Sequence, residues 1–486
     1  MALPLSRRQF LLGGLALGGS AALAACGRPD TTPVSSRSTP TTSSLSDAKA
    51  AKQLSAEPIS LDIGGIEAKT WGYSLEGGSP AIDITAGDTL RVEVTNNLPE
   101  STSVHWHGLA VPNDMDGVPG MTQDPIEPGS SFTYEFQVNQ PGTYFYHSHS
   151  GIQLDKGLHA PLIVRDPNDP GDYDVEWTIL LDDWMDGVDG QTPEAELKML
   201  QSMGSMSSMS AMGSGMMMSH GSGDYMLGGD TGDVPYPYYL LNQRIPSACR
   251  TFTAKPGQKA KLRFINAAAD TIFKIALGGH TLTLTHTDGY AVEPTEVSSF
   301  YLAMGERADA IVTLDDGAFP LAAIAAGKDD RAFAVVRTGS GEAPSATTTF
   351  DELATAGTFL IDRRPAESSL LDVGTISRTS DIELTGQMMP YKWGITVDGE
   401  SGPVTAAQGQ NLRMTIHNAT AMAHPMHLHG HTWSLPDSGG LRKDTILVLP
   451  GESVNADLVA NNPGEWAFHC HNGYHMSTGM MTSLQY

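Results

Sequence analysis

Ten histidines of this sequence lie in four short motifs whose spacing could bind metal. Side chains at positions i and i+2 of a β-strand point to the same face, so each His-x-His pair presents two imidazoles to one side. Buried imidazoles at this density would repel one another if charged and would lack partners if neutral, so the pattern predicts bound metal. The motifs are His105-Trp106-His107, His147-Ser148-His149, His424-Pro425-Met426-His427-Leu428-His429, and His469-Cys470-His471 with His475.

Cys470 stands between two of these histidines, so its side chain is expected on the opposite face of the same strand. There it can meet His424 and His475, with Met480 as a weak axial ligand. Imidazole alone suits copper, zinc, iron or nickel, but two histidines, a cysteine and a distant methionine are the ligands of a blue-copper electron-transfer site. We therefore expect one metal site on each face of the strand, with Cys470 as the covalent route between them.

Repeated sequence markers predict the elements that position these residues. Strand-like runs alternate with turn residues, and no long stretch has the helical period, which indicates an all-β fold. Three runs begin with a turn glycine, alternate, and end in asparagine, and a second glycine marker follows each of them. The first runs are 87–96, 257–266 and 409–418, and the second markers are Gly129, Gly305 and Gly451. We expect three homologous β domains at residues 56–166, 167–345 and 346–486.

The first and third repeats share more than the middle one. "QPGTYFYHSHS" aligns with "NPGEWAFHCHN", and "VHWHGL" aligns with "MHLHGH". Cys470 therefore occupies the position of Ser148 in the first domain. Two pairs of imidazoles from each of these two domains are expected to face one another, while the middle domain carries none of the motifs. His159, His280 and His286 are interpreted as structural.

The start of the chain predicts export. "SRRQFL" is a twin-arginine signature, and the apolar run behind it is shorter than the ~20 residues of a membrane span. "LAAC", ending at Cys26, resembles a lipobox, although an ordinary signal peptide with an incidental cysteine is the alternative. We expect residues 1–26 to be a lipoprotein-type signal and residues 27–55 to be a Ser/Thr/Pro-rich linker. We expect the protein to be periplasmic or extracytoplasmic and lipid-anchored to the outer face of the cytoplasmic membrane.

Charge and cysteine content exclude several classes of partner. The net charge of −26 repels nucleic acid and anionic membrane surfaces, so membrane contact is expected only through a lipid on Cys26. Beyond Cys26 the chain has only Cys249 and Cys470, which implies no disulfide framework.

The motifs "HWHG", "HSH", "HPMHLHGH" and "HCHNGYHMSTGM" resemble those of the multicopper oxidases, the laccase-like family, from about residue 60 to the end. The resemblance implies three consecutive cupredoxin-like Greek-key β-sandwiches and four copper ions. It implies a type 1 copper on His424, Cys470, His475 and Met480, a type 2 copper on His105 and His427, and a type 3 pair on His107, His147, His149, His429, His469 and His471.

The resemblance also implies an activity. Single electrons from a small reductant enter at type 1 copper, and the other three coppers reduce O₂ to water. Asp116, in "NDMDGVPG", matches a family acid near type 2 copper and is expected to relay protons, although an acid that shapes the turn before Gly117 is the alternative. Met476 stands where many bacterial members have an acid, so the resemblance does not identify a second proton donor.

A methionine-rich insertion, residues 199–226, interrupts the middle domain and points to the reductant. Thioethers are soft ligands that select Cu(I), and because Ser and Gly separate most of these methionines we expect none on a packed strand or helix. Met422, close to His424, is a further candidate to pass electrons from Cu(I), or else an apolar neighbour of copper. The methionines of the insertion are Met199, Met203, Met206, Met209, Met212, Met216, Met217, Met218 and Met226.

Three functions are compatible with these features. The first is a cuprous oxidase in copper tolerance, since the insertion resembles those of copper-resistance oxidases, with slower activity on phenols. The second is a laccase that oxidises phenols or aromatic amines, with the insertion as a lid or as a low-complexity segment without a ligand role. The third is a copper store or carrier without turnover, which would not need the Cys–His route. A copper nitrite reductase needs fewer ligands than the four motifs supply.

Overall fold

The structure, a computed structural model, describes residues 52–76, 78–203, 224–229 and 231–486. The expected export signal, Cys26 and most of the expected linker lie outside these residues. Among the helices of the described ranges, none has both the length and the apolar content needed to cross a bilayer.

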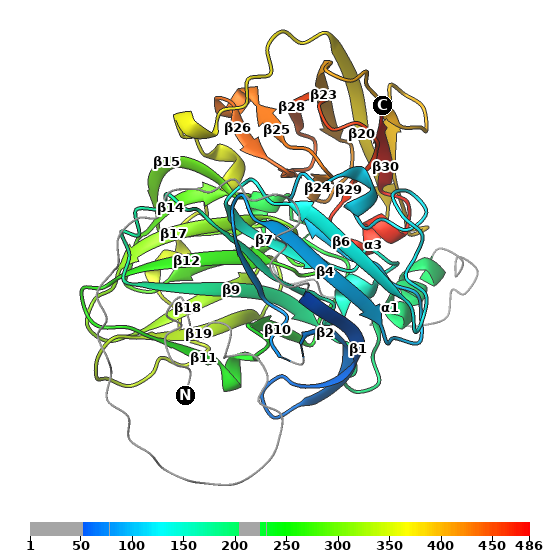
Figure 1. Cartoon of the computed structure of the whole chain (residues 1–486). Helices are drawn as coiled ribbons and strands as arrows, with labels where there is room; N and C mark the ends of the chain where they lie inside the picture. Colours follow the sequence, from blue (N-terminus) through cyan, green and yellow to red (C-terminus); the bar gives the residue numbers. More distant parts are fainter. Residues whose placement is uncertain (1–51, 77, 204–223, 230) are drawn as a thin grey trace.

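Three β-sandwiches follow one another along the chain, and the all-β prediction is confirmed (Figure 1). The first domain has sheets in the order β2-β1-β4-β6 and β3-β8-β7-β5. Its strands are β1 (Lys52–Asp62), β2 (Glu67–Leu75), β3 (Ile82–Thr85), β4 (Thr89–Asn96), β5 (His105–His107), β6 (Ser131–Gln137), β7 (Gly142–His147) and β8 (His159–Arg165).

The middle domain has sheets in the order β10-β9-β12-β17-β14-β15 and β11-β19-β18-β13-β16. Its strands are β9 (Val175–Trp184), β10 (Tyr238–Leu241), β11 (Arg250–Thr253), β12 (Lys259–Asn266), β13 (Phe273–Leu277), β14 (Leu282–Thr287), β15 (Tyr290–Val297), β16 (Phe300–Leu302), β17 (Arg307–Thr313), β18 (Ala318–Ala325) and β19 (Arg331–Arg337).

The third domain has sheets in the order β21-β20-β23-β28-β25-β26 and β22-β30-β29-β24-β27. Its strands are β20 (Arg378–Gln387), β21 (Lys392–Val397), β22 (Val404–Thr405), β23 (Asn411–Asn418), β24 (His424–Leu428), β25 (Trp433–Leu435), β26 (Leu441–Lys443), β27 (Thr445–Val448), β28 (Ser453–Val459), β29 (Glu465–Cys470) and β30 (Met481–Gln485).

Short helices connect the strands. The α-helices are α1 (Pro193–Met203), α2 (Asp351–Ala354) and α3 (Gly473–Ser477). The 3₁₀ turns are η2 (Asn113–Met115), η3 (Gln153–Asp155), η4 (Tyr225–Leu227), η5 (Pro246–Ala248), η6 (Leu360–Asp362), η7 (Glu367–Ser369) and η8 (Pro436–Ser438).

The asparagine that closes each repeated run has the same structural role in all three domains. Strands β4, β12 and β23 end at Asn96, Asn266 and Asn418, which are buried. Each side-chain amide donates to two backbone carbonyls, one four or five residues on and one about 30 residues on or more, and each side-chain oxygen accepts from the amide two residues on. Because a buried backbone group needs a partner, this asparagine fixes the loops that lead from the repeated strand to the next sheet.

The two glycines of each repeat form the matching turns. In the first domain the Gly87 amide donates to Val138 O at 2.7 Å, and the Gly129 amide donates to Asn96 O at 2.7 Å. Both glycines have positive φ, at 94° and 76°, a region that residues with a side chain rarely adopt. The marker glycines of the other two domains also have positive φ, so the sequence repeat reflects one repeated backbone path.

The middle domain packs against the first through a small apolar cluster. Strand β12 is buried along nearly its whole length, whereas β4 and β23 alternate between buried and half-buried positions. Phe145 of β7 packs with Leu180, Ile265 and Ala267 of the middle domain. Because β12 is covered on both faces, it marks an interdomain contact, and the charged side chains of Lys261 and Arg263 on its second face are paired with acidic residues.

Two segments near the expected domain limits make contacts that the sequence does not report. Strand β1 begins at Lys52, and residues 52–56 pair with residues 92–96, so the end of the expected linker 27–55 belongs to a sheet. Residues 346–377, expected to begin the third domain, contact the middle one: Phe359 stacks on Tyr301 with ring centroids 4.9 Å apart, and Lys274 Nζ donates to Thr355 O. Composition does not report such contacts, because they depend on tertiary packing.

The expectation that the methionines of the insertion avoid regular structure is wrong for two of them. Met199 and Met203 lie in helix α1, which begins at Pro193. Proline suits the first helical position, acidic residues in the first turn favour the helix dipole, and most of "EAELKMLQ" are good helix formers. Leu200 anchors the helix in the core. Met226 lies in η4, and the remaining six methionines lie outside the described residues.

Candidate metal centres

Strand pairing brings the histidine motifs together at the interface of the first and third domains. In the first domain β5 pairs with β7 so that His105 lies opposite His147. In the third domain β24 pairs with β29 so that His427 lies opposite His469. The two arrangements are equivalent in the repeat, and their histidines face one another across the interface.

The eight histidines of the four His-x-His pairs are all buried and form overlapping groups of three. Within a group, one ligand atom of each residue lies within 4.8 Å of the others. Each group combines residues from both domains, so neither domain alone has a complete set. The groups are His105, His107 and His427; His107, His147 and His471; and His149, His429 and His469.

Five of the eight rings have their Nδ1 atom held by a fixed oxygen. Because carbonyl and carboxylate oxygens accept, these Nδ1 atoms donate, and Nε2 of each neutral ring keeps its lone pair. Two such Nε2 atoms, of His429 and His469, lie 2.9 Å apart. Lone pairs this close repel unless a cation lies between them. The Nδ1 contacts are His105 to Asp116 O (2.9 Å), His427 to Asp444 O (2.8 Å), His429 to Asp116 Oδ2 (2.9 Å), His147 to Ser148 O (2.8 Å) and His469 to Cys470 O (2.9 Å).

Several buried ring nitrogens have no hydrogen-bond partner among the described residues. In the histidine cluster they are Nδ1 of His107, Nε2 of His147 and both nitrogens of His471. Because most buried polar atoms are paired, such a set is explained by metal coordination, and imidazole nitrogens suit copper. The residues present therefore fit bound copper.

The pKa values of these rings favour the ligand form. Burial, followed by the charges of neighbouring histidines, lowers the pKa of His107, His427 and His429 well below 6.5. Burial also lowers the pKa of His469 to about 4. The rings are neutral at neutral pH, which is the state that binds a metal ion.

A second group, His424, Cys470 and His475, lies on the other face of β29. Cys470 Sγ is 3.7 Å from Nδ1 of each histidine, and the two Nδ1 atoms are 3.1 Å apart. The Met480 side chain is buried, and its backbone oxygen accepts from the Cys470 amide at 3.0 Å. The structure thus brings a sulfur and two nitrogens together in a closed, buried site.

The outer sides of the two rings in this second group are fixed by the protein. His424 Nε2 lies 2.7 Å from Thr420 Oγ1, and His475 Nε2 lies 3.0 Å from Asp233 Oδ2. Burial lowers the pKa of His475, but the hydrogen bonds that this ring forms with Asp233 and Cys470 outweigh burial and raise that pKa to about 10. The Asp233 carboxylate therefore stabilises positive charge on this ring, and a metal ion at Nδ1 would take the place of the ring's second proton.

Cys470 connects the two centres as the sequence pattern predicts. Its neighbours His469 and His471 belong to two different histidine groups, while its sulfur belongs to the second centre. A short backbone path therefore joins both centres.

Asp116 lies directly against the histidine cluster. It is fully buried, its Oδ2 accepts from His429 and its backbone oxygen accepts from His105. Its other carboxylate oxygen, Oδ1, has no hydrogen-bond partner among the described residues and lies 3.3 Å from His105 Nδ1. Asp116 thus has a free oxygen beside two of the candidate ligands.

His159, His280 and His286 belong to none of the candidate ligand groups formed by the described residues. Met422 is buried in the core, and Thr420 links its backbone to His424. His159 bonds to Asp182 at 3.0 Å, and His280 Nδ1 donates to Gly278 O. His286 Nδ1 lies 3.0 Å from Thr285 Oγ1.

Sequence reasoning missed several residues that surround these centres. Asp233 contacts His475 across 242 positions of the chain, and Trp393 packs at a tilt against the same ring with centroids 4.1 Å apart. Asp444 holds His427 through its backbone oxygen. None of the three belongs to a metal-ligand motif. The signals that the sequence offers are the place of Asp233 soon after the methionine-rich insertion and the place of Asp444 shortly after "HLHGH".

Comparisons with known proteins agree across the whole chain. Residues 56–169, 176–341 and 375–486 each match a family model described as multicopper oxidase. Multicopper oxidase MmcO of Mycobacterium tuberculosis is 44% identical over 99% of this chain and 96% of its own length. Copper resistance protein A of Escherichia coli is 29% identical over 100% of both chains. Laccase-1 of Cryptococcus neoformans var. grubii is 30% identical over 83% of this chain and 74% of its own.

Solved structures share the fold. Fet3p, described as a multicopper oxidase that functions in iron import, has a TM-score of 0.73 at 20% identity and covers 89% of each chain. A laccase from Botrytis aclada has a TM-score of 0.69 at 24% identity, over 89% of this chain and 86% of its own. The prediction of three consecutive cupredoxin-like sandwiches is confirmed.

Proposed function

The chain belongs to the multicopper oxidases, and we propose that its reductant is Cu(I), which it oxidises to Cu(II) in copper tolerance with O₂ as electron acceptor. The chain is therefore an oxidoreductase. In the balanced reaction, four Cu(I) ions and four protons react with one O₂ to give four Cu(II) ions and two waters.

We assign four resident copper ions to the two centres. Type 1 copper is assigned to His424, Cys470, His475 and Met480, type 2 copper to His105 and His427, and the type 3 pair to His107, His147, His149, His429, His469 and His471. The fixed Nδ1 atoms and the unpartnered nitrogens described above support this assignment. When bound, copper supplies one-electron redox chemistry, from the reductant at the cysteine centre to O₂ at the histidine cluster.

The observation that carries the choice of Cu(I) is the contact between Asp233 and His475. Asp233 lies in the segment that returns from the methionine-rich insertion, and its Oδ2 accepts from His475 Nε2 and, at 2.6 Å, from the Tyr391 hydroxyl. The insertion is thereby joined to the ring that holds type 1 copper in our assignment. A carboxylate at this point also attracts a cationic substrate more than a neutral phenol.

Further contacts support the position of the returning segment beside the third domain. Gly228 packs so closely on Pro450 that a Cβ atom there would lie 2.5 Å from Pro450 Cγ. Met199 and Met226, at the two described ends of the insertion, are 39% and 40% exposed. Exposed thioethers on both sides of the insertion are available to a soft cation from solvent.

Asp116 is proposed to hold and pass protons during O₂ reduction. Its unpartnered Oδ1 atom is available to carry a proton, while Oδ2 stays bonded to His429. General acid groups need this position within reach of the reacting centre.

Replacing the thioethers of the insertion tests the proposed substrate. Leucine keeps the length and apolar character of methionine and removes the sulfur, so the variant isolates the ligand role. We expect kcat/KM for Cu(I) to fall far more than kcat/KM for a phenol. The substitutions are Met206→Leu, Met209→Leu, Met212→Leu, Met216→Leu, Met217→Leu and Met218→Leu.

A matched control changes the same number of serines in the same segment to alanine and should leave both activities unchanged. Equal loss for Cu(I) and phenol in the leucine variant, or no loss for either, would refute the role of the insertion. The control substitutions are Ser205→Ala, Ser207→Ala, Ser208→Ala, Ser210→Ala, Ser214→Ala and Ser219→Ala.

A laccase activity on phenols is the second candidate, favoured by the 30% identity to a laccase. Oxygen uptake with Cu(I) and with phenols separates the two, because a laccase proper would prefer the phenol in the unaltered protein. We also propose export by the twin-arginine route and a lipid on Cys26; Cys26→Ala should release the protein from the membrane fraction.

A further inference from the structure

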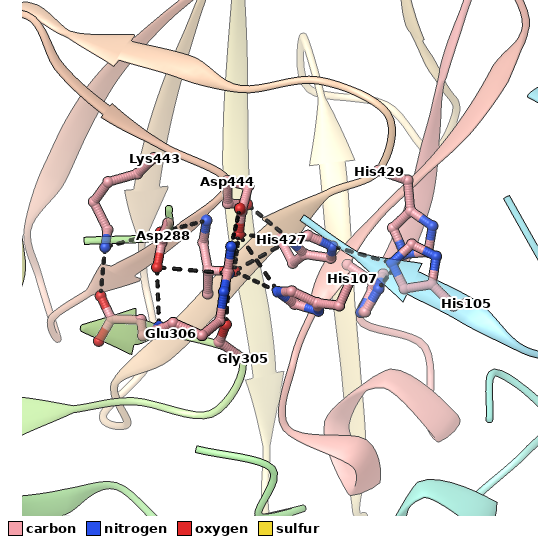
Figure 2. A network of polar contacts seen from close by, with 12 residues as sticks. His105, His107, Asp288, Gly305, Glu306, His427, His429, Lys443 and Asp444 are labelled. Atoms are coloured by element: carbon pink, nitrogen blue, oxygen red, sulfur yellow. Dashed lines mark hydrogen bonds and ion pairs between the residues drawn. The ribbon is translucent and has the colours of Figure 1, made fainter. Parts of the chain in front are cut away.

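A fully buried charged network connects the middle domain to the histidine cluster (Figure 2). Asp288, Glu306 and Arg307 come from the middle domain, at the β14–β15 turn and the start of β17. Lys443 and Asp444 come from the third domain, where Lys443 ends β26 and Asp444 lies between β26 and β27. Buried charges are costly unless they are paired, so a network of this size calls for a reason beyond stability.

The members of this network are paired with short, direct contacts. Arg307 forms a two-pronged pair with Asp444, with nitrogen–oxygen distances of 2.7 and 2.6 Å. Lys443 Nζ lies 2.9 Å from Asp288 Oδ2 and 3.0 Å from Glu306 Oε1. Asp288 Oδ1 also accepts from the Arg307 amide at 3.1 Å. Each charge therefore fixes the position of the next.

Asp444 is the point where this network meets candidate copper ligands of two domains. Its backbone oxygen accepts from His427 Nδ1 at 2.8 Å, and its Oδ1 atom lies 3.4 Å from His107 Nε2. Thr445 Oγ1 donates to the same Oδ1 atom and lies 3.2 Å from His107 Nε2. These contacts hold the outer nitrogens of the two rings, which leaves His107 Nδ1 and His427 Nε2 to face the cluster.

Arg307 is in contact with all three domains. Besides Asp444 of the third domain, its Nε donates to Thr143 O of the first domain at 3.2 Å, and its Nη1 donates to Gly305 O of the middle domain at 2.9 Å. Gly305 lies against the cluster: a Cβ atom there would be 2.8 Å from His471 Cδ2 and 3.0 Å from His107 Cε1. The guanidinium thus positions both the Asp444 carboxylate and the backbone that packs on the rings.

We propose that Arg307 is a positioning residue of the histidine cluster. Through it the middle domain, the source of none of the assigned ligands, controls how tightly His427 holds type 2 copper. The inference rests on the copper assignment above and not on the identity of the reductant. Loss of an outer contact to a metal ligand typically weakens metal binding by ~10–100-fold.

The main test is Arg307→Lys, which keeps the buried positive charge but cannot form the two-pronged contact. The variant is loaded with copper and dialysed against a copper chelator, and retained copper is measured with the type 2 electron paramagnetic resonance signal. We expect retention of type 2 copper to weaken by roughly 10-fold or more and its signal to change. The blue absorption of type 1 copper should stay as in the unaltered protein.

Arg263→Lys is the matched control. Arg263 is also buried in the middle domain, pairs with Asp309 and Glu176, and contacts Thr143 of the first domain, but it touches no candidate ligand. Unchanged copper retention and signal in Arg307→Lys would overturn the proposal. So would an equal change in Arg263→Lys, because general loosening would then explain both.

A double variant, Arg307→Gln with Asp444→Asn, removes both charges of the pair without leaving one unpaired. It is used if the single variant fails to fold, and the same loss of type 2 copper is expected; full retention would refute the proposal. Because retention and spectrum do not depend on the reductant, a protein that oxidises phenols instead of Cu(I) would contradict the proposed substrate and leave this inference intact.

Discussion

One carboxyl group holds all three domains together, and its removal gives a sharp prediction about stability. Asp155, at the end of η3 in the first domain, accepts through Oδ2 from the Tyr236 hydroxyl of the middle domain at 2.9 Å. The same atom accepts from the Tyr474 hydroxyl of the third domain at 2.6 Å. All three side chains are buried, and Tyr474 directly precedes His475 in helix α3.

Asp155→Ala leaves two buried hydroxyls with only each other as partners, so at least one donor is unpaired. An unpaired buried group costs about 1–3 kcal/mol, so the substitution should lower the free energy of unfolding by about 1–3 kcal/mol or more. Asp155→Asn keeps an oxygen in the same place and should cost about 1 kcal/mol or less. The difference between the two variants isolates the hydrogen bonds from the change of charge.

The pH dependence of this position follows from its surroundings. Burial, followed by Asp183 and Asp182, raises the pKa of Asp155 well above the value of about 3.9 that an unfolded aspartate has. The folded state therefore binds this proton more tightly, and the unaltered protein loses stability as the pH rises from about 4 toward the folded-state pKa. Asparagine does not titrate, so the stability of Asp155→Asn relative to the unaltered protein should improve over the same range.

Urea unfolding of the metal-free proteins at several pH values measures both effects. Tyr236→Phe and Tyr474→Phe remove one donor each and should be less destabilising than Asp155→Ala. Combined with Asp155→Ala they should add little, because the contact is already lost. Equal stability of the alanine and asparagine variants, or full additivity with the tyrosine variants, would show that the hydrogen bonds to Asp155 do not stabilise the folded state.

Three further predictions concern the metal centres. Cys470→Ser should remove the blue absorption while the histidine cluster keeps its copper, because the sulfur belongs to the second centre alone; a blue variant would disprove that ligand set. Asp116→Asn should slow O₂ reduction by roughly 100- to 10,000-fold without slowing reduction of the blue site, as measured by stopped-flow absorption. An unchanged rate of O₂ reduction would exclude a proton role for Asp116. The metal-free protein should lose thermal stability as the pH falls below about 6.5. The folded-state pKa values of His107, His427 and His429 are lowered, so the unfolded state binds more protons at these rings. The free energy of unfolding should therefore fall by up to about 1.4 kcal/mol per pH unit for each ring. A melting temperature that does not change between pH 7.5 and 5.5 would contradict this.

The sequence predicts best what is local and repeated. The spacing of His469, Cys470 and His471 determines which side chains share a face of a strand, and the three closing asparagines reveal the domain repeat before any contact is known. These features depend on strand geometry, which needs only neighbouring residues.

Contacts between domains could not be predicted in this way. Arg307 with Asp444, Asp233 with His475, and Asp155 with its two tyrosines join residues far apart in the chain, at positions without a motif or a period. Helix α1 was missed for a different reason: the Ser and Gly of the insertion hid the helix-forming residues that precede them. Asp116 was predicted in part: the sequence motif identifies the residue, but the motif does not show its hydrogen bonds to two histidines.

Copper content is the most direct test of the account, which depends on two centres joined through Cys470. The fully loaded protein should contain four copper ions per chain by metal analysis, with one blue site and one type 2 signal in the electron paramagnetic resonance spectrum. A fully loaded, folded protein that bound no more than one or two copper ions per chain would contradict it.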